Sequence, residues 1–374
     1  MNVCVVLLAA QAMVTWPKLS VVGDWKVALE WGADRVEFDV PPGAAVRGVK
    51  PRKDCWGVWQ EGPQRLDAIV RTADGRCVYR PGPEVEFLPP EPKLAAGERL
   101  AGTVWVTVKT QKLSQDDLYP VLAPRMRRHQ CQWNEPPARD ACPKAVKKLK
   151  SGEKLRILAW GDSCTEQLFL KPEEHWQNRF VKRLKEIYPK ANIELVTHAW
   201  GGYTTRAFLE QKPGAEHNFA EKILGAEPDL VISEFVNDGN YNNYGDNPNL
   251  DVDKARKFAE TTILADYETI YKAFQEKGIE WVICVPHYTR PDWMGKKSPQ
   301  ECDDDPRPYC KILRCFSATH KVALADAARY WGALRKSGIP YPIYFNNGIN
   351  HPELGGMQFY DWALDDLFRN GEPL

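Results

Sequence analysis

The sequence has no excess of charge of either sign. Its 374 residues contain 50 Lys plus Arg and 50 Asp plus Glu, so the formal net charge is zero. A balanced chain has no global field that would attract nucleic acid or an anionic membrane surface, and no glycine-rich phosphate loop follows a strand pattern. We therefore expect no nucleic-acid partner.

A long hydrophobic run is also missing, since no stretch reaches the ~18 apolar residues that a membrane span needs. A short apolar run at residues 3–10 ends in Ala10-Gln11-Ala12, which resembles a signal-peptidase site, but no basic segment precedes it. The run is either a degraded export signal or a first strand. The compartment therefore stays open, secreted or periplasmic in the first case and cytoplasmic in the second.

No cysteine pair has CxxC spacing, and no histidine lies at a spacing that indicates zinc. The ten cysteines are scattered along the chain, and we expect no metal and no cofactor. In a secreted protein, Cys302 with Cys310, or Cys131 with Cys142, are candidate disulfide pairs. The sequence does not decide between these pairs and free thiols, and it does not give the oligomeric state.

What is present is typical of a globular protein, with 43% hydrophobic and 27% charged residues. At ~150 residues per domain, the length predicts two domains. We expect the export signal or first strand at residues 1–19, a β-sandwich domain at 20–125, a connection at 126–153 and a second domain at 154–374.

The first domain has the pattern of short antiparallel strands. Strands are predicted at 35–40, 66–71 and 76–79, and Asp74-Gly75 is a hairpin signal between the last two. Residues 103–109 alternate apolar and polar side chains, which predicts a half-buried strand. Because no helical period competes here, we expect an all-β sandwich of jelly-roll type.

The second domain alternates strands and amphipathic helices, which is typical of a three-layer α/β domain with a parallel sheet. Five strands are predicted, at 155–160, 193–199, 230–235, 281–285 and 322–324. Helices are predicted at 173–187, 205–210, 253–276, 325–336 and 354–368. In such folds the chemistry lies beyond the carboxyl ends of the strands.

Four short motifs occupy those positions. Gly161-Asp162-Ser163 follows the first strand, and Trp200-Gly201-Gly202 follows the second. Asn237 follows the third strand, and His351 precedes the last helix. Asp162 and Asp238, which lie beside two of these residues, are expected to cap helices or to hold their neighbours by hydrogen bonds.

This order of blocks resembles the SGNH hydrolases, or GDSL esterase/lipase superfamily, over residues 155–368. The resemblance implies a flavodoxin-like α/β/α fold with Ser163 as nucleophile and His351 as base. It implies an oxyanion hole made by the Ser163 N–H, the Gly202 N–H and the Asn237 side chain. Gly202 is preferred to Gly201 because Gly202-Tyr203-Thr204-Thr205 matches the family's glycine-x-Thr-Ser/Thr ending.

The sequence departs from the family at the acid that should precede the histidine. The positions three and four residues before His351 are Gly348 and Asn347. Either a Ser/His dyad suffices, with a backbone carbonyl or Asn347 orienting His351, or a carboxylate comes from elsewhere, or the protein is not catalytic. The candidate carboxylates are Asp292, Glu353 and the acidic run at 303–305.

Polar and aromatic residues gather near the predicted crevice. The loop at 286–308 is either a solvated surface loop or part of a sugar-binding surface, in which aromatic faces stack on pyranose rings. The residues predicted to contact substrate are Trp200, Tyr203, His287, Arg290 and Trp293.

The function we expect is hydrolysis of O-acyl groups, above all O-acetyl groups, from carbohydrate through an acyl-Ser163 intermediate. A sandwich joined to such a catalytic domain resembles certain carbohydrate acetylesterases. The alternatives are a carbohydrate-binding relative without activity and a lipase or phospholipid esterase.

Overall fold

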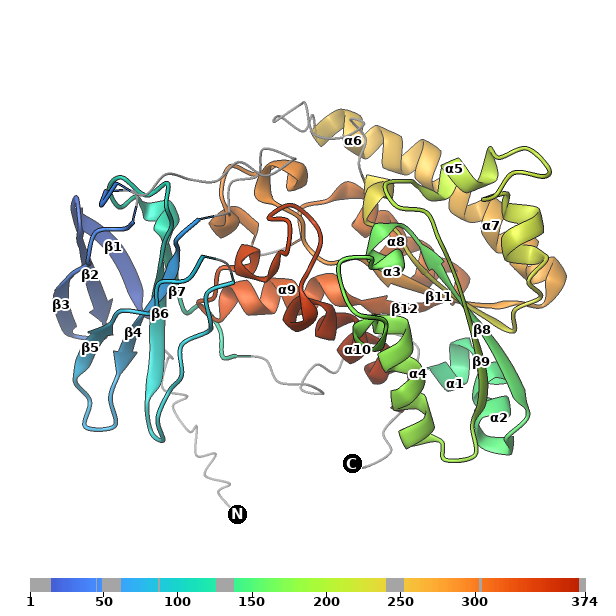
Figure 1. The fold of residues 1–374 in the computed structure, drawn as a ribbon, viewed down its shortest axis with the longest axis horizontal. Coiled ribbons are helices and arrows are strands. Elements are labelled where there is room, and N and C mark those ends of the chain that lie inside the picture. The colour runs from blue at the N-terminus through green and yellow to red at the C-terminus, as the bar shows by residue number, and fades with distance from the viewer. Residues whose placement is uncertain are drawn as a thin grey trace, which may run out of the picture.

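The computed structural model describes residues 15–44, 46–48, 62–86, 88–125, 138–239, 252–302 and 305–369. Two antiparallel sheets lie at one end of the molecule and an α/β unit at the other (Figure 1). The expected all-β part followed by a three-layer α/β part is confirmed.

The N-terminal part consists of two sheets packed face to face. One has the order β1-β2-β3 and the other β5-β4-β6-β7, and all their pairings are antiparallel. Leu19, Val27 and Leu29 of the first sheet share a buried cluster with Ile69 and Val104 of the second. The strands are β1 Lys18–Gly23, β2 Lys26–Trp31, β3 Asp34–Asp39, β4 Arg65–Arg71, β5 Cys77–Arg80, β6 Arg99–Val106 and β7 Leu118–Pro120.

Strand β6 is buried on both faces, which corrects the prediction of a half-buried strand. Val104 and Thr103, which point to opposite faces, are both 0% exposed. The Val104 face meets the first sheet, while Thr103 Oγ1 donates a hydrogen bond of 2.7 Å to the carbonyl of Gly338 in the α/β part. Trp105 belongs to the same hydrophobic cluster as the α/β core. The apolar and polar faces both became interior because a second unit packs on the sheet.

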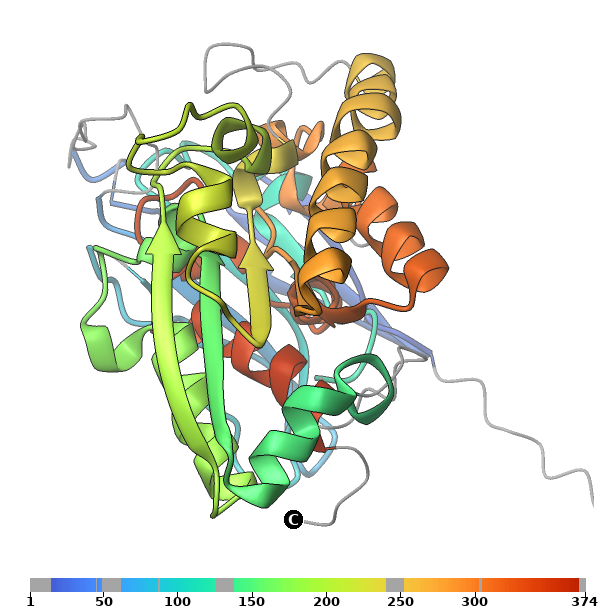
Figure 2. The ribbon, with the colours of Figure 1, turned by 90° about the vertical axis from the view of Figure 1, so that its right-hand side faces the viewer.

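All five predicted parallel strands are present, each within two residues of its predicted ends. They are β8 Lys154–Gly161, β9 Asn192–Ala199, β10 Leu230–Glu234, β11 Glu280–Val285 and β12 Ala323–Asp326. Every neighbouring pair is parallel, and the order is β9-β8-β10-β11-β12. This order is the flavodoxin-like one, so the predicted fold class is confirmed. Figure 2 shows β8, β9 and β10 side by side.

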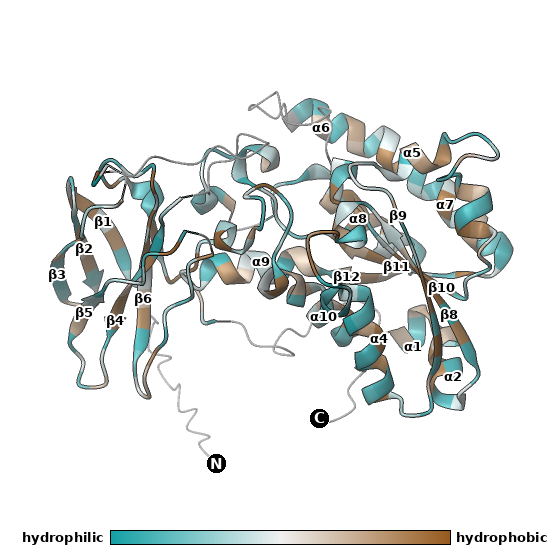
Figure 3. Ribbon diagram, in the orientation of Figure 1, coloured by the Kyte–Doolittle hydropathy of each residue, from teal (hydrophilic) through white to brown (hydrophobic). Residues whose placement is uncertain are grey.

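Helices flank this sheet on both sides, with α5 and α7 on one side and α4 and α10 on the other (Figure 1). Hydrophobic positions concentrate on the central strands, while the outer helices carry many hydrophilic residues (Figure 3). The helices are α1 Ala138–Ala141, α2 Pro143–Ser151, α3 Ser163–Glu166, α4 Trp176–Ile187, α5 Thr205–Leu209, α6 Val252–Phe258, α7 Leu264–Lys277, α8 Pro308–His320, α9 Ala327–Lys336 and α10 Leu354–Arg369. No helix among the described residues is long and apolar enough to cross a membrane.

Several details differ from the predictions, since strands β1, β2 and β7 and the short helices α1 and α3 were not predicted. Helix α8 was not predicted, and a π-helical turn at Ala259–Ile263 joins α6 to α7 where one continuous helix was expected. In the predicted connection, α2 packs Ala145 and Leu149 into the α/β core. Cys302 and Cys310 are free thiols, as is Cys142, whereas Cys131 and residues 1–14 lie outside the described residues.

Candidate active site

Ser163 lies at the tight turn between β8 and α3. Asp162 caps α3, and its Oδ1 accepts a hydrogen bond of 2.9 Å from the N–H of Cys164. Residue 161, which precedes Asp162, must be glycine. A Cβ on Gly161 would lie 2.2 Å from Thr165 Oγ1 and 2.3 Å from the carbonyl oxygen of Glu234. The turn therefore presents the Ser163 hydroxyl at the carboxyl edge of the sheet.

His351 reaches Ser163 from the loop before α10. Its Nε2 lies 2.9 Å from Ser163 Oγ, which is hydrogen-bond distance. Asn347 shapes the loop, because its Oδ1 accepts hydrogen bonds from the N–H groups of Ile349 (2.9 Å), Asn350 (3.0 Å) and His351 (2.9 Å). The structure thus brings together two residues that are far apart in the sequence and were predicted to form a nucleophile and base.

No carboxylate among the described residues is hydrogen-bonded to the His351 ring. Asp292 pairs with Arg290, Asp305 pairs with Arg307, and Glu353 accepts from the backbone N–H of Gly356. Residues 303 and 304 lie outside the described residues. Asn347 holds the backbone of the loop, and no hydrogen bond from its side chain to the ring is found among the described residues, so the alternative in which Asn347 orients His351 directly is not supported.

The ring of Phe169 stacks on His351 instead. The centroids are 4.5 Å apart and the planes differ by 8°. Burial lowers the pKa of His351 to about 4, so the imidazole is neutral at neutral pH. Sequence reasoning missed Phe169, since nothing in a single aromatic residue six positions after Ser163 signals a contact with a distant histidine.

Asn237 supplies a buried amide donor at the Ser163 turn, where it also faces Asp162 and helps to lower the pKa of that carboxyl against the raising effect of burial. Its Nδ2 is buried and has no hydrogen-bond partner in the described part of the chain. Its backbone N–H donates to Asp162 Oδ2 at 2.9 Å, which ties the end of β10 to the Ser163 turn. A buried donor without an acceptor costs free energy unless something fills the site. Asn237 is therefore ready to bind an oxygen that the protein itself does not provide.

The glycine turn after β9 lies next to these residues. A Cβ on Gly201 would approach Ser163 Cβ to 3.7 Å, and Gly202 has φ +83°, a conformation that favours glycine. Asp238 accepts hydrogen bonds from the N–H of Thr205 (2.8 Å) and the hydroxyl of Tyr267 (3.0 Å). The expected hydrogen-bonding roles of Asp162 and Asp238 are both present.

Residues 159–359 match the model of the GDSL-like Lipase/Acylhydrolase family. The chain belongs to this family. The resemblance stated from the sequence is thereby confirmed, and the Ser163 turn, the glycine turn, Asn237 and His351 all lie within the matched range.

Among solved structures, the GDSL-like chain is similar to a two-domain esterase (CEX) active on acetylated mannans, with 16% identity, a TM-score of 0.44, and coverage of 62% of this chain and 54% of that chain. It is also similar to a mutant of Axe2, an acetylxylan esterase from Geobacillus stearothermophilus, with 15% identity, a TM-score of 0.42 and coverage of 56% and 92%. A third similar structure is the acetyl xylan esterase AlAXEase, with 20% identity, a TM-score of 0.41 and coverage of 56% and 97%. The match thus spans about half the length of the two-domain esterase. A comparison with curated proteins finds no match.

A carboxylate that sequence reasoning missed lies close to Ser163 in this GDSL-like site. Glu166 Oε2 would be 2.7 Å from a Cβ on Gly201, the same position that lies 3.7 Å from Ser163 Cβ. The spacing gives a signal, because residues three apart share one face of a helix. Glu166 makes the rim of the site polar.

The aromatic residues of the glycine turn form a stack. Trp200 lies between Tyr203, at a centroid distance of 3.5 Å, and His217, at 4.3 Å. Both faces of Trp200 are therefore covered, while Tyr203 is 43% exposed. Of the two residues predicted to contact substrate here, only Tyr203 offers a free ring face.

Arg290 and Trp293 lie on the loop after β11, as predicted. The guanidinium of Arg290 lies 5.4 Å from the Trp293 ring centroid and pairs with Asp292. Arg290 and Asp292 line a cleft of about 680 Å³ that Trp105 and Tyr119 of the β-part also line. The N–H of Arg290 donates to the carbonyl of Ile349, so this loop is joined to the His351 loop.

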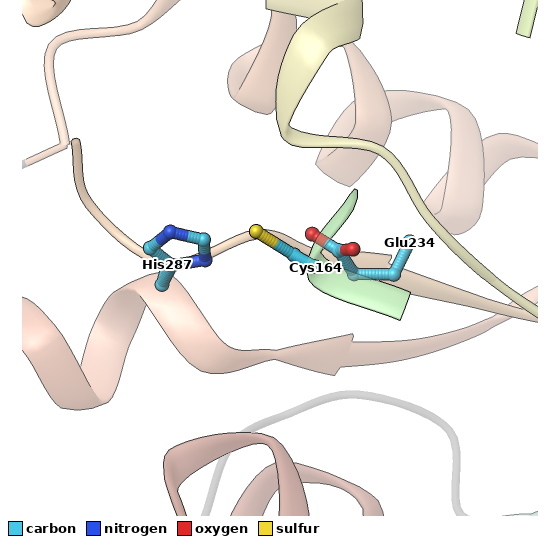
Figure 4. A group of neighbouring side chains, drawn as sticks. All are labelled: Cys164, Glu234 and His287. Atoms are coloured by element: carbon cyan, nitrogen blue, oxygen red, sulfur yellow. The ribbon is translucent and has the colours of Figure 1, made fainter. Parts of the chain in front are cut away.

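His287 is placed in the interior and not at a substrate-binding surface, which corrects the prediction for this residue. It is 0% exposed, and both ring nitrogens have hydrogen-bond partners within the protein. Three side chains that could bind a metal ion converge here, those of Cys164, Glu234 and His287. Their potential ligand atoms all lie within 4.8 Å of one another (Figure 4). Each of the three is already engaged in hydrogen bonds.

Proposed function

We propose that the protein is a carboxylic ester hydrolase that removes O-acyl groups, above all O-acetyl groups, from carbohydrate. The observation that carries the proposal is the contact of 2.9 Å between His351 Nε2 and Ser163 Oγ. A serine hydroxyl is a weak nucleophile unless a base takes its proton, and a neutral imidazole is such a base.

The reaction begins when Ser163 Oγ attacks the ester carbonyl carbon and its proton passes to His351 Nε2. The carbonyl oxygen becomes an oxyanion, which accepts hydrogen bonds from Asn237 Nδ2 and the N–H groups of Ser163 and Gly202. As the bond to the sugar oxygen breaks, His351 returns the proton to that oxygen. Water then attacks acyl-Ser163 by the same route, releasing the acid and restoring the hydroxyl.

His351 works without an acid partner in this proposal. The Asn347 bonds hold the loop, and the face of Phe169 holds the ring plane. A π-face also attracts a cation, so Phe169 stabilises the imidazolium that forms as Ser163 attacks. This contribution is smaller than that of a carboxylate, and we expect a slow enzyme.

The surroundings of Ser163 favour a short acyl group on a polar carrier. Glu166 lies against Gly201, where the path of a long apolar chain would bring methylene groups against a carboxylate. The exposed ring of Tyr203 offers a face on which a pyranose can stack. Together these residues support an acetylated sugar as the substrate.

The test is hydrolysis of p-nitrophenyl acetate and octanoate, and of an acetylated oligosaccharide, by the parent, Ser163→Ala and the control Ser151→Ala. We expect turnover in the parent and control, loss in Ser163→Ala, and kcat/KM higher for acetate than for octanoate. Ser151 is exposed at the end of α2, so Ser151→Ala controls for the loss of a serine hydroxyl outside the site.

The other outcomes each identify an alternative. Parental activity in Ser163→Ala would show that the nucleophile is wrong. Binding of the oligosaccharide without turnover by the parent would favour a carbohydrate-binding relative. A higher kcat/KM for octanoate would favour a lipase.

A further inference from the structure

A chain of buried hydrogen bonds runs behind the His351 loop. Glu234 Oε1 lies 2.8 Å from the hydroxyl of Tyr360, and this hydroxyl lies 2.7 Å from His287 Nδ1. His287 Nε2 lies 2.6 Å from the carbonyl oxygen of Asn350, the residue before His351. Glu234, His287 and Tyr360 are all 0% exposed, so these bonds are shielded from bulk solvent.

The Asn350 carbonyl is a junction between the two halves of the site. It accepts from His287 and also from the thiol of Cys164 at 3.3 Å, and Cys164 follows Ser163 in the chain. The same carbonyl therefore connects the neighbour of the proposed nucleophile to the neighbour of the proposed base.

Counting donors and acceptors leaves two protonation states for this chain. A carbonyl only accepts, so His287 Nε2 must carry a hydrogen. If His287 is neutral, Nδ1 accepts the single hydroxyl hydrogen of Tyr360. The tyrosine oxygen also accepts from the backbone N–H of His287 at 3.1 Å, so its contact with Glu234 requires that Glu234 donates. If His287 is an imidazolium, Nδ1 donates to Tyr360 and the hydroxyl donates to an ionised Glu234.

The surroundings favour the neutral state. Arg307 Nη1 donates to the backbone carbonyl of His287 at 2.7 Å, which places a guanidinium charge beside the imidazole. Burial and this charge hold the pKa of His287 well below its usual value. Burial and the neighbouring Asp162 hold the pKa of Glu234 well above its usual value.

The surroundings of the two neighbouring carboxyl groups differ, and they favour an ionised Asp162 and a protonated Glu234. Asp162 accepts backbone N–H groups at both oxygens, from Cys164 and Asn237 at 2.9 Å each, and so suits the ionised form. Glu234 Oε2 accepts from the Thr165 hydroxyl at 3.3 Å, which leaves Oε1 to carry the proton toward Tyr360.

We propose that protonated Glu234, Tyr360 and neutral His287 act as positioning residues that hold the Asn350 carbonyl and thereby set His351 against Ser163. The consequence for catalysis rests on the proposed function, whereas the protonation states do not. The arrangement couples the ends of β10 and β11 and helix α10 to the geometry of the site.

The protonation states are tested first, by spectroscopy on the resting protein. In ¹⁵N NMR we expect His287 to keep the neutral tautomer with hydrogen on Nε2 from about pH 5 to about pH 9, beyond both sides of the ordinary histidine pKa. In infrared difference spectra between the parent and Glu234→Gln, we expect a protonated carboxylic acid band that the variant lacks. An imidazolium at His287 or a carboxylate at Glu234 at neutral pH overturns the proposal.

The positioning role is tested with Tyr360→Phe and the matched control Tyr188→Phe. The Tyr188 hydroxyl donates to a different carbonyl, that of Phe368, at 2.8 Å. We expect Tyr360→Phe to accelerate amide hydrogen exchange at Ile349, Asn350 and His351 and to lower kcat about tenfold with KM unchanged, while the control does neither. Exchange and kcat at parental values in Tyr360→Phe overturn the proposal.

Glu234→Gln gives the conservative rescue. Its amide donates to Tyr360 as a protonated carboxyl does, so exchange and kcat should stay near those of the parent. A large loss in this variant, which removes no charge in the neutral state, would mean that Glu234 is ionised and overturns the proposal. If the parent has no esterase activity, the proposed function fails, while the spectra and the exchange rates still decide this inference.

Discussion

The segments that carry Ser163 and His351 use the same structural device with different chemistry. In each, an Asp or Asn side chain accepts hydrogen bonds from backbone N–H groups that follow it. Asp162 is a fully buried carboxyl that accepts a backbone N–H at each oxygen, whereas Asn347 is a half-buried amide. The comparison teaches that the turn geometry needs only an acceptor oxygen. A carboxylate is used on the serine side, where it also binds the N–H of Asn237, whereas no carboxylate in the described part of the chain is hydrogen-bonded to His351.

The largest effect on kcat should come from Asn237, whose backbone N–H is bound by Asp162. Replacing Asn237 by Ala removes a hydrogen bond that exists only when an oxyanion forms, so kcat should fall by ~10²–10³ with little change in KM. Steady-state kinetics on p-nitrophenyl acetate measure this, with Asn178→Ala on the exposed face of α4 as control. A fall in kcat of less than about threefold in Asn237→Ala would contradict the assignment of the oxyanion hole.

The exchange Asp162→Asn tests whether the serine side needs its carboxylate. The new NH₂ group faces a backbone N–H, so one of the two bonds is lost. We expect the free energy of unfolding to fall by about 1–3 kcal/mol and kcat to fall with it as Asn237 shifts. Urea denaturation and kinetics check both quantities. Unchanged values would show that an amide serves as well on this side as on the other.

The reverse exchange, Asn347→Asp, supplies the missing charge. An Asp oxygen keeps the three backbone bonds, and its charge stabilises the imidazolium, so kcat should rise severalfold. The pH profile adds a second reading. Because the base must be neutral and the pKa of His351 is about 4, kcat/KM of the parent should stay flat from about pH 7 to about pH 5 and fall near pH 4.

In Asn347→Asp the acid limb of that profile should move to higher pH, since a nearby negative charge raises the pKa of an imidazole. Asn346→Asp adds the same charge one residue earlier and serves as control. If both variants shift the limb equally, or if Asn347→Asp leaves kcat unchanged, His351 is not assisted from this position.

The smallest effect should come from Phe169→Leu, which keeps an apolar side chain and removes the ring face. A cation–π contact of ~0.5–1 kcal/mol corresponds to a two- to fivefold loss of kcat. Phe38→Leu removes a ring that contacts Tyr79 in the β-part and controls for the substitution itself. Equal kcat in Phe169→Leu and the parent would leave His351 without its proposed stabilisation.

The parts of the site that follow strands could be predicted from the sequence. Parallel strands bring their carboxyl ends to one edge, so Ser163, Gly202 and Asn237 were expected together, and the spacing of the motifs located each one. His351 was expected because of the order of the blocks. Its distance of 2.9 Å from Ser163 agrees with that expectation.

The parts that depend on packing between distant elements could not be predicted. His287 follows a strand and so suggested a substrate contact, but Tyr360 and Asn350, which enclose it, lie more than 60 residues further along the chain. Thr103 suggested a solvated face, because local alternation does not show that Gly338 covers it. Helix α8 begins at Pro308, a residue that in the sequence marks the end of a loop equally well.

The contact between the two parts of the molecule affects how the enzyme can be shortened. The N–H groups of Leu122 and Ala123 both donate to the carbonyl of Lys336, at 2.7 and 2.9 Å, at the end of α9. Helix ends leave such carbonyls without partners, so the chain leaving the β-part completes a helix of the hydrolase part. Leu66, Trp105 and Tyr119 also belong to the hydrophobic core of that part. A truncation that removes the β-part would expose this core and open the end of α9, so the catalytic unit to be expressed includes the β-sheets.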